Sequence, residues 1–155
     1  MVTLREIEDA DADALFAQMR DPESVVMAAF TAADPDDRAA FDAHRRRIRA
    51  DPQVIARAIL EDGQFVGSIA SFVIEGETEI TYWINRAFWG QGIASRALAA
   101  FLPLVKARPV HARAASDNIG SLRVLQRAGF KITGTDIGYA AGRGKEIEET
   151  LLILP

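Results

Sequence analysis

Cysteine is absent from the 155-residue chain, and histidine is nearly absent, with only His44 and His111. The missing thiols exclude disulfides, thiolate nucleophiles and cysteine-ligated zinc. The two histidines have no neighbouring ligands at the short spacing that metal sites use. We therefore expect no protein-bound metal.

Long apolar runs are also missing, since no stretch of about 18 apolar residues occurs. The chain begins with VTLREIEDADA, which is acidic rather than basic and then apolar, as a secretory leader would be. These features predict a cytoplasmic protein that does not associate with membranes. What the chain does have is 49% hydrophobic residues, enough for a single domain with a sizeable core over residues 1–155.

Charge is unevenly distributed along the chain. The net charge of −4 argues against nonspecific binding to nucleic acid. Residues 86–131, however, carry eight basic residues and one acidic residue, a charge of +7, and the remainder carries −11. Any single arginine can belong to an ordinary solvated helix face, but the clustering indicates an anionic ligand near a cationic one.

Hydrophobic periodicity and turn residues predict an α/β (α+β) fold. About seven strands would form a mixed, mostly antiparallel sheet flanked by about four helices, in the order β-α-α-β-β-β-α-β-α-β-β. The predicted strands are 2–7, 53–60, 64–74, 77–85, 109–115, 130–137 and 146–154, and the predicted helices are 9–19, 35–49, 93–107 and 119–129.

Prolines, glycines and capping residues set the expected boundaries. The pair Asp21-Pro22 would end the first helix, and Asp34 would cap the second, with Pro35 at its first position. Pro103 would kink the third helix or mark its last turns. A glycine-rich loop, GYAAGRGK at 138–145, would separate the last two strands.

The stretch FWGQGIASRAL at 88–98 places Gly90 and Gly92 where a loop becomes a helix. Free N–H groups and the positive end of the helix dipole make such a place an anion site, and small residues allow close approach of a phosphate. The glycines could also serve the turn alone. The spacing and the missing lysine exclude a nucleoside-triphosphate loop, and no acid follows where a dinucleotide fold would need one.

The segment ITYWINRAFWGQGIASRALAAFL, followed by SDNIGSLRVLQRAGFKITG, resembles the GNAT N-acetyltransferase superfamily. Within it, the chain is similar to the RimJ/RimL-like branch of ribosomal-protein N-acetyltransferases, in which a tryptophan precedes the first glycine and Asn-x-x-Ser opens the next helix. The resemblance is specific over about residues 79–134, and the order of elements fits the whole chain.

This resemblance implies acetyl-coenzyme A (acetyl-CoA) as co-substrate. Its pyrophosphate would bind the main-chain amides of residues 91–95, and its pantetheine arm would pair with the main chain of residues 83–85. At Trp89 the family more often has arginine or glutamine, which leaves the amides, Arg86 and Arg96 to attract the phosphates. The implied cofactor-binding residues are Trp83, Ile84, Asn85, Trp89, Gly90, Gln91, Gly92, Ile93, Ala94, Ser95, Arg96, Asn118 and Ser121.

The resemblance also places Asn118 and Ser121 beside the thioester, Asn118 positioning the pantetheine arm and Ser121 offering its hydroxyl to the sulfur. Both also suit a helix start, where Asn118 is a good N-cap and Ser121 falls at the third position. Glu79, on the third strand of the meander, is the candidate general base, and Tyr139 in the glycine-rich loop is an alternative acid or base. An α-amino acceptor would need little help, because a useful fraction of it is already neutral.

The predicted activity is transfer of an acetyl group from acetyl-CoA to a primary amine, directly in a ternary complex. A non-catalytic acyl-CoA sensor is the alternative. The acceptor would be a small molecule or a peptide, and both a monomer and a homodimer are compatible with the sequence. Ten acids within residues 1–37, together with Glu75, Glu77 and Glu79, predict a negative rim that favours a cationic amine.

Overall fold

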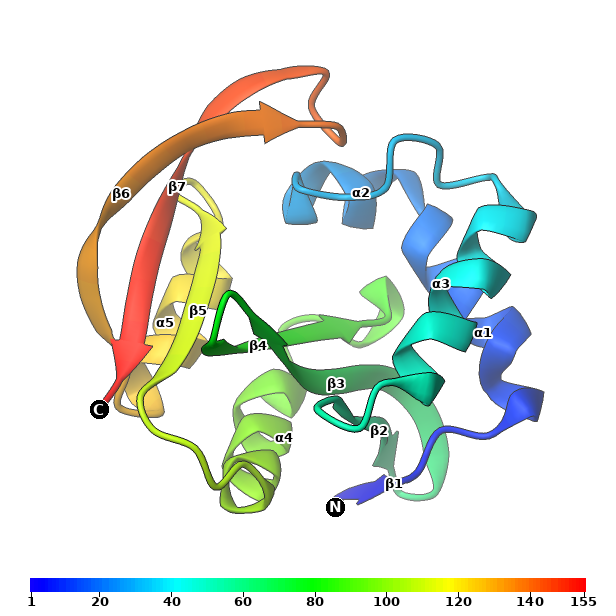
Figure 1. The fold of residues 1–155 in the computed structure, drawn as a ribbon. Coiled ribbons are helices and arrows are strands. Elements are labelled where there is room, and N and C mark those ends of the chain that lie inside the picture. The colour runs from blue at the N-terminus through cyan, green and yellow to red at the C-terminus, as the bar shows by residue number, and fades with distance from the viewer.

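A computed structural model describes all residues 1–155 (Figure 1). Seven strands form one sheet in the order β1-β2-β3-β4-β5-β7-β6. All neighbouring strands are antiparallel except β4 and β5, which are parallel. The strands are β1 (Val2–Arg5), β2 (Ile55–Glu61), β3 (Gln64–Ile74), β4 (Glu77–Ile84), β5 (Val110–Ala115), β6 (Lys131–Ala140) and β7 (Lys145–Leu154).

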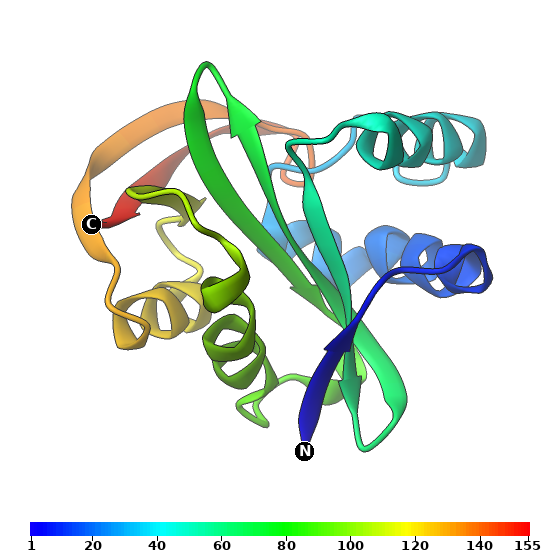
Figure 2. The ribbon, with the colours of Figure 1, turned by 60° about the horizontal axis from the view of Figure 1, so that its bottom comes forward.

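Five α-helices cover the two faces of this sheet, so the predicted fold class is confirmed with one helix more than expected. Helices α1, α2 and α3 lie on one face, and α4 and α5 lie on the other (Figure 2). None of the helices is both long and apolar enough to cross a membrane. They are α1 (Ala12–Arg20), α2 (Pro22–Ala28), α3 (Arg38–Ala50), α4 (Ile93–Phe101) and α5 (Ile119–Arg127), with 3-10 turns at Asp9–Asp11, Arg86–Phe88 and Leu102–Leu104.

The prediction that Asp21-Pro22 ends the first helix is confirmed, and the same pair also begins the additional helix, α2. The Asp21 carboxylate accepts a hydrogen bond of 3.0 Å from the main-chain N–H of Ser24. Pro22 occupies the first helical position, where no N–H donor is needed. The same two residues therefore end α1 and begin α2.

Helix α3 begins three residues later than predicted. Asp37, not Asp34, is its N-cap, and its carboxylate accepts a hydrogen bond of 3.0 Å from the N–H of Ala40. Asp34 instead accepts a 3.0 Å bond from the N–H of Asp36, which makes a turn around Pro35.

The predicted glycine-rich loop is also shorter than expected, because the β6–β7 ladder continues to the pair Ala140–Lys145. Only residues 141–144 form the turn, and Gly142 in it lies directly against α2. A Cβ at Gly142 would lie 2.3 Å from the carbonyl oxygen of Val25, so only glycine fits there. The N–H of Gly142 donates to the carbonyl of Ala29 at 2.8 Å, which joins the turn to the end of α2.

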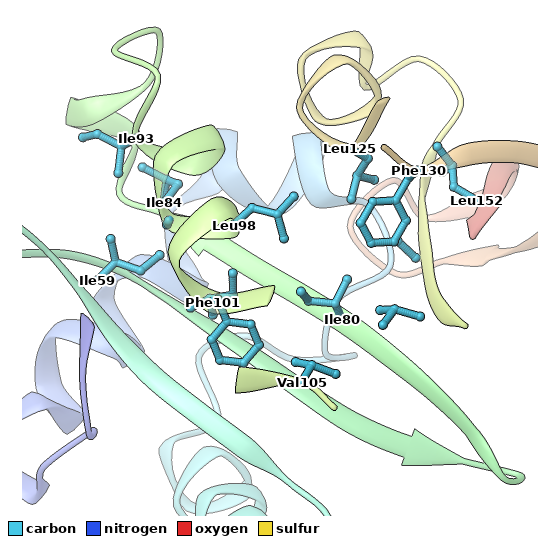
Figure 3. Packing of buried hydrophobic residues seen from close by; sticks show 14 of the residues in the cluster. Ile59, Ile80, Ile84, Ile93, Leu98, Phe101, Val105, Leu125, Phe130 and Leu152 are labelled. Carbon is cyan, nitrogen blue, oxygen red and sulfur yellow. The ribbon is translucent and has the colours of Figure 1, made fainter. Parts of the chain in front are cut away.

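The main core lies between the sheet and the α4–α5 face (Figure 3). Ile80 and Ile84 of β4 pack there with Leu98 and Phe101 of α4 and Leu125 of α5. Full burial of a large apolar side chain such as Phe101 contributes about 1.5–3 kcal/mol. This packing holds α4, α5 and the even-numbered residues of β4 in fixed positions.

Strands β4 and β5 diverge after a short contact. They pair only at Thr78–Val110 and Glu79–His111, whereas β4 stays paired with β3 as far as Ile84. The N–H of Asn85 donates to Val66 of β3, and the main-chain groups of successive strand residues alternate in direction. The N–H and C=O groups of residues 80, 82 and 84 therefore face the gap between β4 and β5.

Candidate functional site

A cavity of about 1030 Å³ lies at the gap between β4 and β5. Its walls include Glu79, Thr81 and Trp83 from one face of β4 and Ile80, Tyr82 and Ile84 from the other. The cavity therefore passes the open edge of β4 and reaches both faces of the sheet. We call its two parts the α4–α5 side and the α2 side.

The glycine loop borders the α4–α5 side. Gly90 and Gly92 have φ values of +78° and +72°, and Gly92 is the N-cap of α4. A Cβ at either glycine would meet no atom within 4 Å, so neither glycine is required by close packing. Their positive φ favours glycine, and the open space beside the start of α4 suits an anion. Six loop and helix residues predicted to bind the cofactor line the cavity: Trp89, Gly90, Gly92, Ile93, Ala94 and Ser95.

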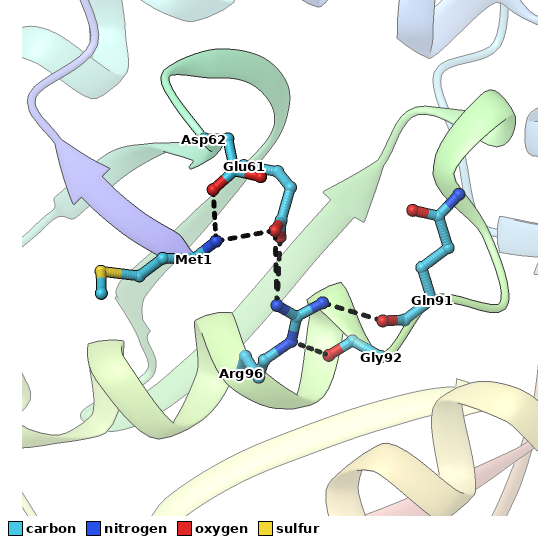
Figure 4. Close-up of polar contacts among 6 residues, drawn as sticks. All are labelled: Met1, Glu61, Asp62, Gln91, Gly92 and Arg96. Atoms are coloured by element: carbon cyan, nitrogen blue, oxygen red, sulfur yellow. Dashed lines mark hydrogen bonds and ion pairs between the residues drawn. The ribbon is translucent and has the colours of Figure 1, made fainter.

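Arg96 and Gln91 do not line the cavity. The Arg96 guanidinium turns back onto the loop and donates to the carbonyls of Gln91 at 2.8 Å and Gly92 at 3.3 Å (Figure 4). It also forms an ion pair with Glu61 at 3.2 Å. Arg96 thus stabilises the shape of the loop and is not free to attract an anion.

Arg86 is engaged as well, since it pairs with Asp21 at 2.9 Å and with Glu23 at 3.3 Å. The free cationic groups on this side are instead Arg123 and Arg127 of α5, which line the cavity and form no ion pair within the chain. Sequence reasoning missed them as a pair, although their i, i+4 spacing places them on one helix face.

Two of the three residues predicted to pair with the pantetheine arm point their main-chain groups elsewhere. Those of Trp83 and Asn85 face β3, and the Asn85 side chain accepts from the N–H of Ala87. Only Ile84 of the three faces the gap, and its carbonyl accepts a 2.9 Å hydrogen bond from the indole of Trp89. The groups that face the gap with no strand partner are those of Tyr82 and the carbonyl of Ile80, since the Ile80 N–H belongs to the pair Glu79–His111.

Ser121 lines the cavity and contacts a residue that sequence analysis did not select. Its hydroxyl lies 2.7 Å from the phenol of Tyr82. Burial raises the pKa of Tyr82, and the hydrogen bond to Ser121 partly opposes this rise. The phenol therefore stays protonated at neutral pH. No local motif joins these two residues, so only the fold reveals the pair.

Asn118 is the N-cap of α5, as its type suggested, and its carboxamide oxygen accepts from the N–H of Ser121 at 3.3 Å. Its amide nitrogen donates to the carbonyl of Met27 in α2 at 3.4 Å. Asn118 thus lies in the cavity wall where α5 and α2 meet.

Glu79 is buried, with an exposed fraction of 9%, whereas a glutamate on a strand is usually solvated. It is the last β4 residue paired with β5, at the point where the gap opens. The Arg113 guanidinium donates to Glu79 at 3.2 Å and to the buried Glu149 of β7 at 2.9 Å. Arg113 and Glu149 were not anticipated, because only strand pairing brings them beside Glu79.

Tyr139 does not join this group. It lies on β6 rather than in a loop, paired with Glu146, and its side chain is 65% exposed. It does not line the cavity. The structure therefore does not bring the alternative acid or base together with Glu79 and Ser121.

The acids of residues 1–37 do not form a free negative rim. Most of them pair with arginines, which come from the first three helices, from β1 and from the turn after β4. The paired acids are Asp9, Asp11, Asp13, Asp21, Glu23 and Asp36, and their partners are Arg49, Arg5, Arg38, Arg86 and Arg20. Negative charge in the cavity comes instead from Glu79, Asp117 and Glu149.

The sequence matches the family model described as the acetyltransferase (GNAT) domain over residues 1–131. The chain belongs to the GNAT acetyltransferase family. No curated protein sequence matches this GNAT chain.

Solved structures share its fold. RimJ of Mycobacterium smegmatis, solved with CoA-disulfide, is 24% identical over 98% of this chain and 80% of that chain, with a TM-score of 0.81. A phosphinothricin acetyltransferase from Sinorhizobium meliloti, solved with acetyl-CoA, is 17% identical over 98% and 86%, with a TM-score of 0.82. The ribosomal-protein-alanine N-acetyltransferase from Brucella melitensis is 20% identical over 97% and 98%, with a TM-score of 0.75.

Proposed function

We propose that residues 1–155 form one cytoplasmic N-acetyltransferase domain that moves an acetyl group from acetyl-CoA to a primary amine, directly in a ternary complex. The observation that carries the proposal is the cavity through the β4–β5 gap. It has the glycine loop and the start of α4 on one face of the sheet and carboxylates on the other, so two substrates can meet at the open edge of β4. Relatives solved with acetyl-CoA or CoA-disulfide support the choice of cofactor.

On the α4–α5 side, the first amides of α4 would hold the pyrophosphate. The open space beside Gly90 and Gly92 leaves room for it. Arg123 and Arg127 would supply the attraction that was expected of Arg86 and Arg96, because they face the cavity without a carboxylate partner. The free main-chain groups of Tyr82 and the free carbonyl of Ile80 would hydrogen-bond the pantetheine arm as an added strand would.

Acetyl-CoA supplies the activated acyl group, a thioester with a good leaving thiolate. In the transfer, the amine lone pair forms the new C–N bond, the C–S bond breaks, and its electron pair stays on sulfur. A main-chain N–H at the β4 edge would donate to the carbonyl oxygen as negative charge develops there. Glu79 or water would take the proton from nitrogen, and the Ser121 hydroxyl would donate a hydrogen bond to the departing thiolate. The thiolate, whose pKa as a model thiol is about 8.5, would then take a proton from water.

Tyr82 would act as a positioning residue for Ser121. If the Tyr82 phenol donates to the Ser121 oxygen, the hydrogen of Ser121 is free to point at the sulfur. The raised pKa of Tyr82 supports the phenol as donor. One oxygen of Glu79 is engaged by Arg113, which leaves the other for the acceptor amine. Tyr139 has no role in this proposal.

Thermal unfolding tests cofactor binding. Acetyl-CoA should raise the melting temperature and ATP and NAD should not, since a ligand at 100 times its Kd adds about 2.7 kcal/mol of stability. No shift at saturating acetyl-CoA would contradict the proposal.

Turnover is tested by thiol release with a panel of amines: peptides with free N-termini, polyamines, amino acids and aminoglycosides. Release that depends on an amine, and falls when Ser121 is replaced by Ala, is expected. Binding without release for any amine would favour the non-catalytic sensor.

A further inference from the structure

The α2 side of the cavity has an apolar wall. It is lined by Met27 and Phe30 at the end of α2 and by Phe72 and Ile74 of β3. Met27, Phe30 and Ile74 remain 41%, 37% and 50% exposed, although they are large apolar side chains. Apolar side chains left exposed together in a hollow are typical of ligand sites.

Strand register places this wall beside the carboxylates. Phe72 pairs directly with Glu79 across the antiparallel β3–β4 ladder, and directly opposed residues point to the same face. Ile74 is two residues further along β3 and so shares that face. An occupant that contacts Phe72 is therefore next to Glu79.

The opposite part of the wall is held in place by hydrogen bonds. Arg143, in the β6–β7 turn, donates to the carbonyl of Val26 at 2.6 Å and to both oxygens of Asp117 at 2.7 and 2.9 Å. These bonds tie the end of α2 to the start of α5. Met27 and Phe30 thus face the cavity from a fixed segment, which is a preorganised wall.

The α2 side carries one uncompensated negative charge. Arg113 neutralises one of the two buried carboxylates, Glu79 and Glu149, but not both. Asp117, the remaining acid of the cavity, is paired with Arg143. Arg123 and Arg127, which line the cavity, belong to α5, and α5 lies on the other face of the sheet (Figure 2). One positive charge on an occupant would balance this side.

We propose that the acceptor is a monocationic primary amine with an apolar body, an arylalkyl or branched alkyl amine. Its ammonium binds at Glu79 and Glu149, and its apolar body lies on Phe72, Ile74, Met27 and Phe30. A second ammonium group would lie against the apolar wall, and a carboxylate would lie against Glu149. Diamines and free amino acids are therefore poor acceptors. The inference rests on the proposed acetyltransferase function and specifies its substrate class.

The test compares 2-phenylethylamine with 1,4-diaminobutane and phenylalanine, with kcat/KM measured by thiol release at saturating acetyl-CoA. We expect 2-phenylethylamine to exceed each of the others at least about tenfold, the range that a filled apolar pocket gives. If 1,4-diaminobutane or phenylalanine is as good as or better than 2-phenylethylamine, the inference is wrong.

A matched pair of variants locates the wall. Ile74→Thr should raise the KM for 2-phenylethylamine several-fold and leave the KM for acetyl-CoA unchanged, and threonine is well tolerated in strands. Ile137→Thr on β6 makes the same change at a 68% exposed position outside the cavity and should alter neither constant. An unchanged amine KM in Ile74→Thr would also overturn the inference.

The two proposals fail in different ways. If acetyl-CoA raises the melting temperature and other amines are acetylated in preference, the substrate class is wrong and the acetyltransferase function stands. If acetyl-CoA binds but no amine is acetylated, the substrate class is wrong and a sensor is favoured. If acetyl-CoA does not bind, the proposed function itself fails.

Discussion

The two sides of the cavity are built in different ways. The α4–α5 side includes the amides of one short stretch at the start of one helix, residues 89–95 without Gln91. The α2 side consists of side chains from α2, β3, β4, β5 and β7, which are far apart in sequence. A site made of consecutive amides can be found from glycine spacing, whereas a site made of distant side chains depends on strand pairing.

The largest expected effect is on acetyl-CoA binding at the α4–α5 side. Replacing Gly92 with Val adds a branched side chain at a positive φ and fills the open space beside the amides. Affinity for acetyl-CoA should fall at least about 100-fold, or about 2.7 kcal/mol, in calorimetric titration.

Gly63→Val is its matched control. Gly63 has a φ of +82° with open space around it, in the β2–β3 turn outside the cavity. It should show the same backbone strain, about 1–3 kcal/mol of lost stability, with normal acetyl-CoA affinity. Equal loss of affinity in both variants would mean that strain, and not the loop, explains the effect.

The next largest expected effect is on stability and concerns the carboxylates of the α2 side. Arg113→Met leaves Glu79 and Glu149 buried together without their shared cation. The free energy of unfolding should fall by about 1–3 kcal/mol in urea, less than for a fully buried pair because half of Arg113 is exposed. Adding Glu149→Gln should restore part of this stability. If the double variant is less stable than Arg113→Met, carboxylate repulsion is not the cause.

A smaller effect, on kcat, is expected for Tyr82, which contacts Ser121. Tyr82→Phe removes the hydroxyl that contacts Ser121, and kcat should fall up to about tenfold, the value of one hydrogen bond. The KM for acetyl-CoA should stay nearly unchanged, and the high-pH limb of the kcat profile should shift. Tyr139→Phe on the exposed face of β6 should change neither quantity. A loss of activity in Tyr139→Phe would return that residue to the list of catalytic candidates.

The smallest expected effect is on stability and comes from the Arg143–Asp117 ion pair, which helps to join α2 to α5. Arg143 lowers the pKa of Asp117 below its ordinary value of 3.8. A lowered pKa means that the pair stabilises the folded state above about pH 4 and that this stability is lost as the pH falls through the folded-state value. Asp117→Asn should cost less than about 1 kcal/mol at pH 7, since the Asp117 side chain is 64% exposed.

The measurement is urea unfolding of the unchanged protein and of the Asp117→Asn variant from pH 7 down to pH 2. The difference in stability should shrink toward zero at the acid end. A difference that is constant with pH would show that the carboxylate charge does not matter.

Much of the fold could be predicted because its signals are local. An apolar run between two turns predicted β3 at 64–74, and the cap at Asn118 indicated the start of α5. Asp21-Pro22 correctly indicated the end of α1, but α2 was missed because a proline after an aspartate fits both a helix end and a helix start. Tyr139 misled because glycines beside it suggested a loop, whereas cross-strand pairing with β7 extends β6.

The features of the candidate site also divide into local ones, which could be predicted, and those that depend on the fold, which could not. The glycine loop could be located from glycines within a few residues of one another, and Ser121 was selected from the family resemblance. The pairing of Arg113 with Glu79 and Glu149 could not, because it depends on which strands become neighbours. The ion pairs of Arg86 and Arg96 could not be predicted for the same reason, since their carboxylate partners come from the start of α2 and from β2.

The central claim, that the two substrates meet through the β4–β5 gap, is tested most directly by a crystal structure of the protein with acetyl-CoA. The account predicts phosphate oxygens within hydrogen-bond distance of the amides at the start of α4. It also predicts the thioester in the gap, beside the main chain of Tyr82 and the hydroxyl of Ser121. Acetyl-CoA bound elsewhere, or with its acetyl group outside the gap, would contradict the account.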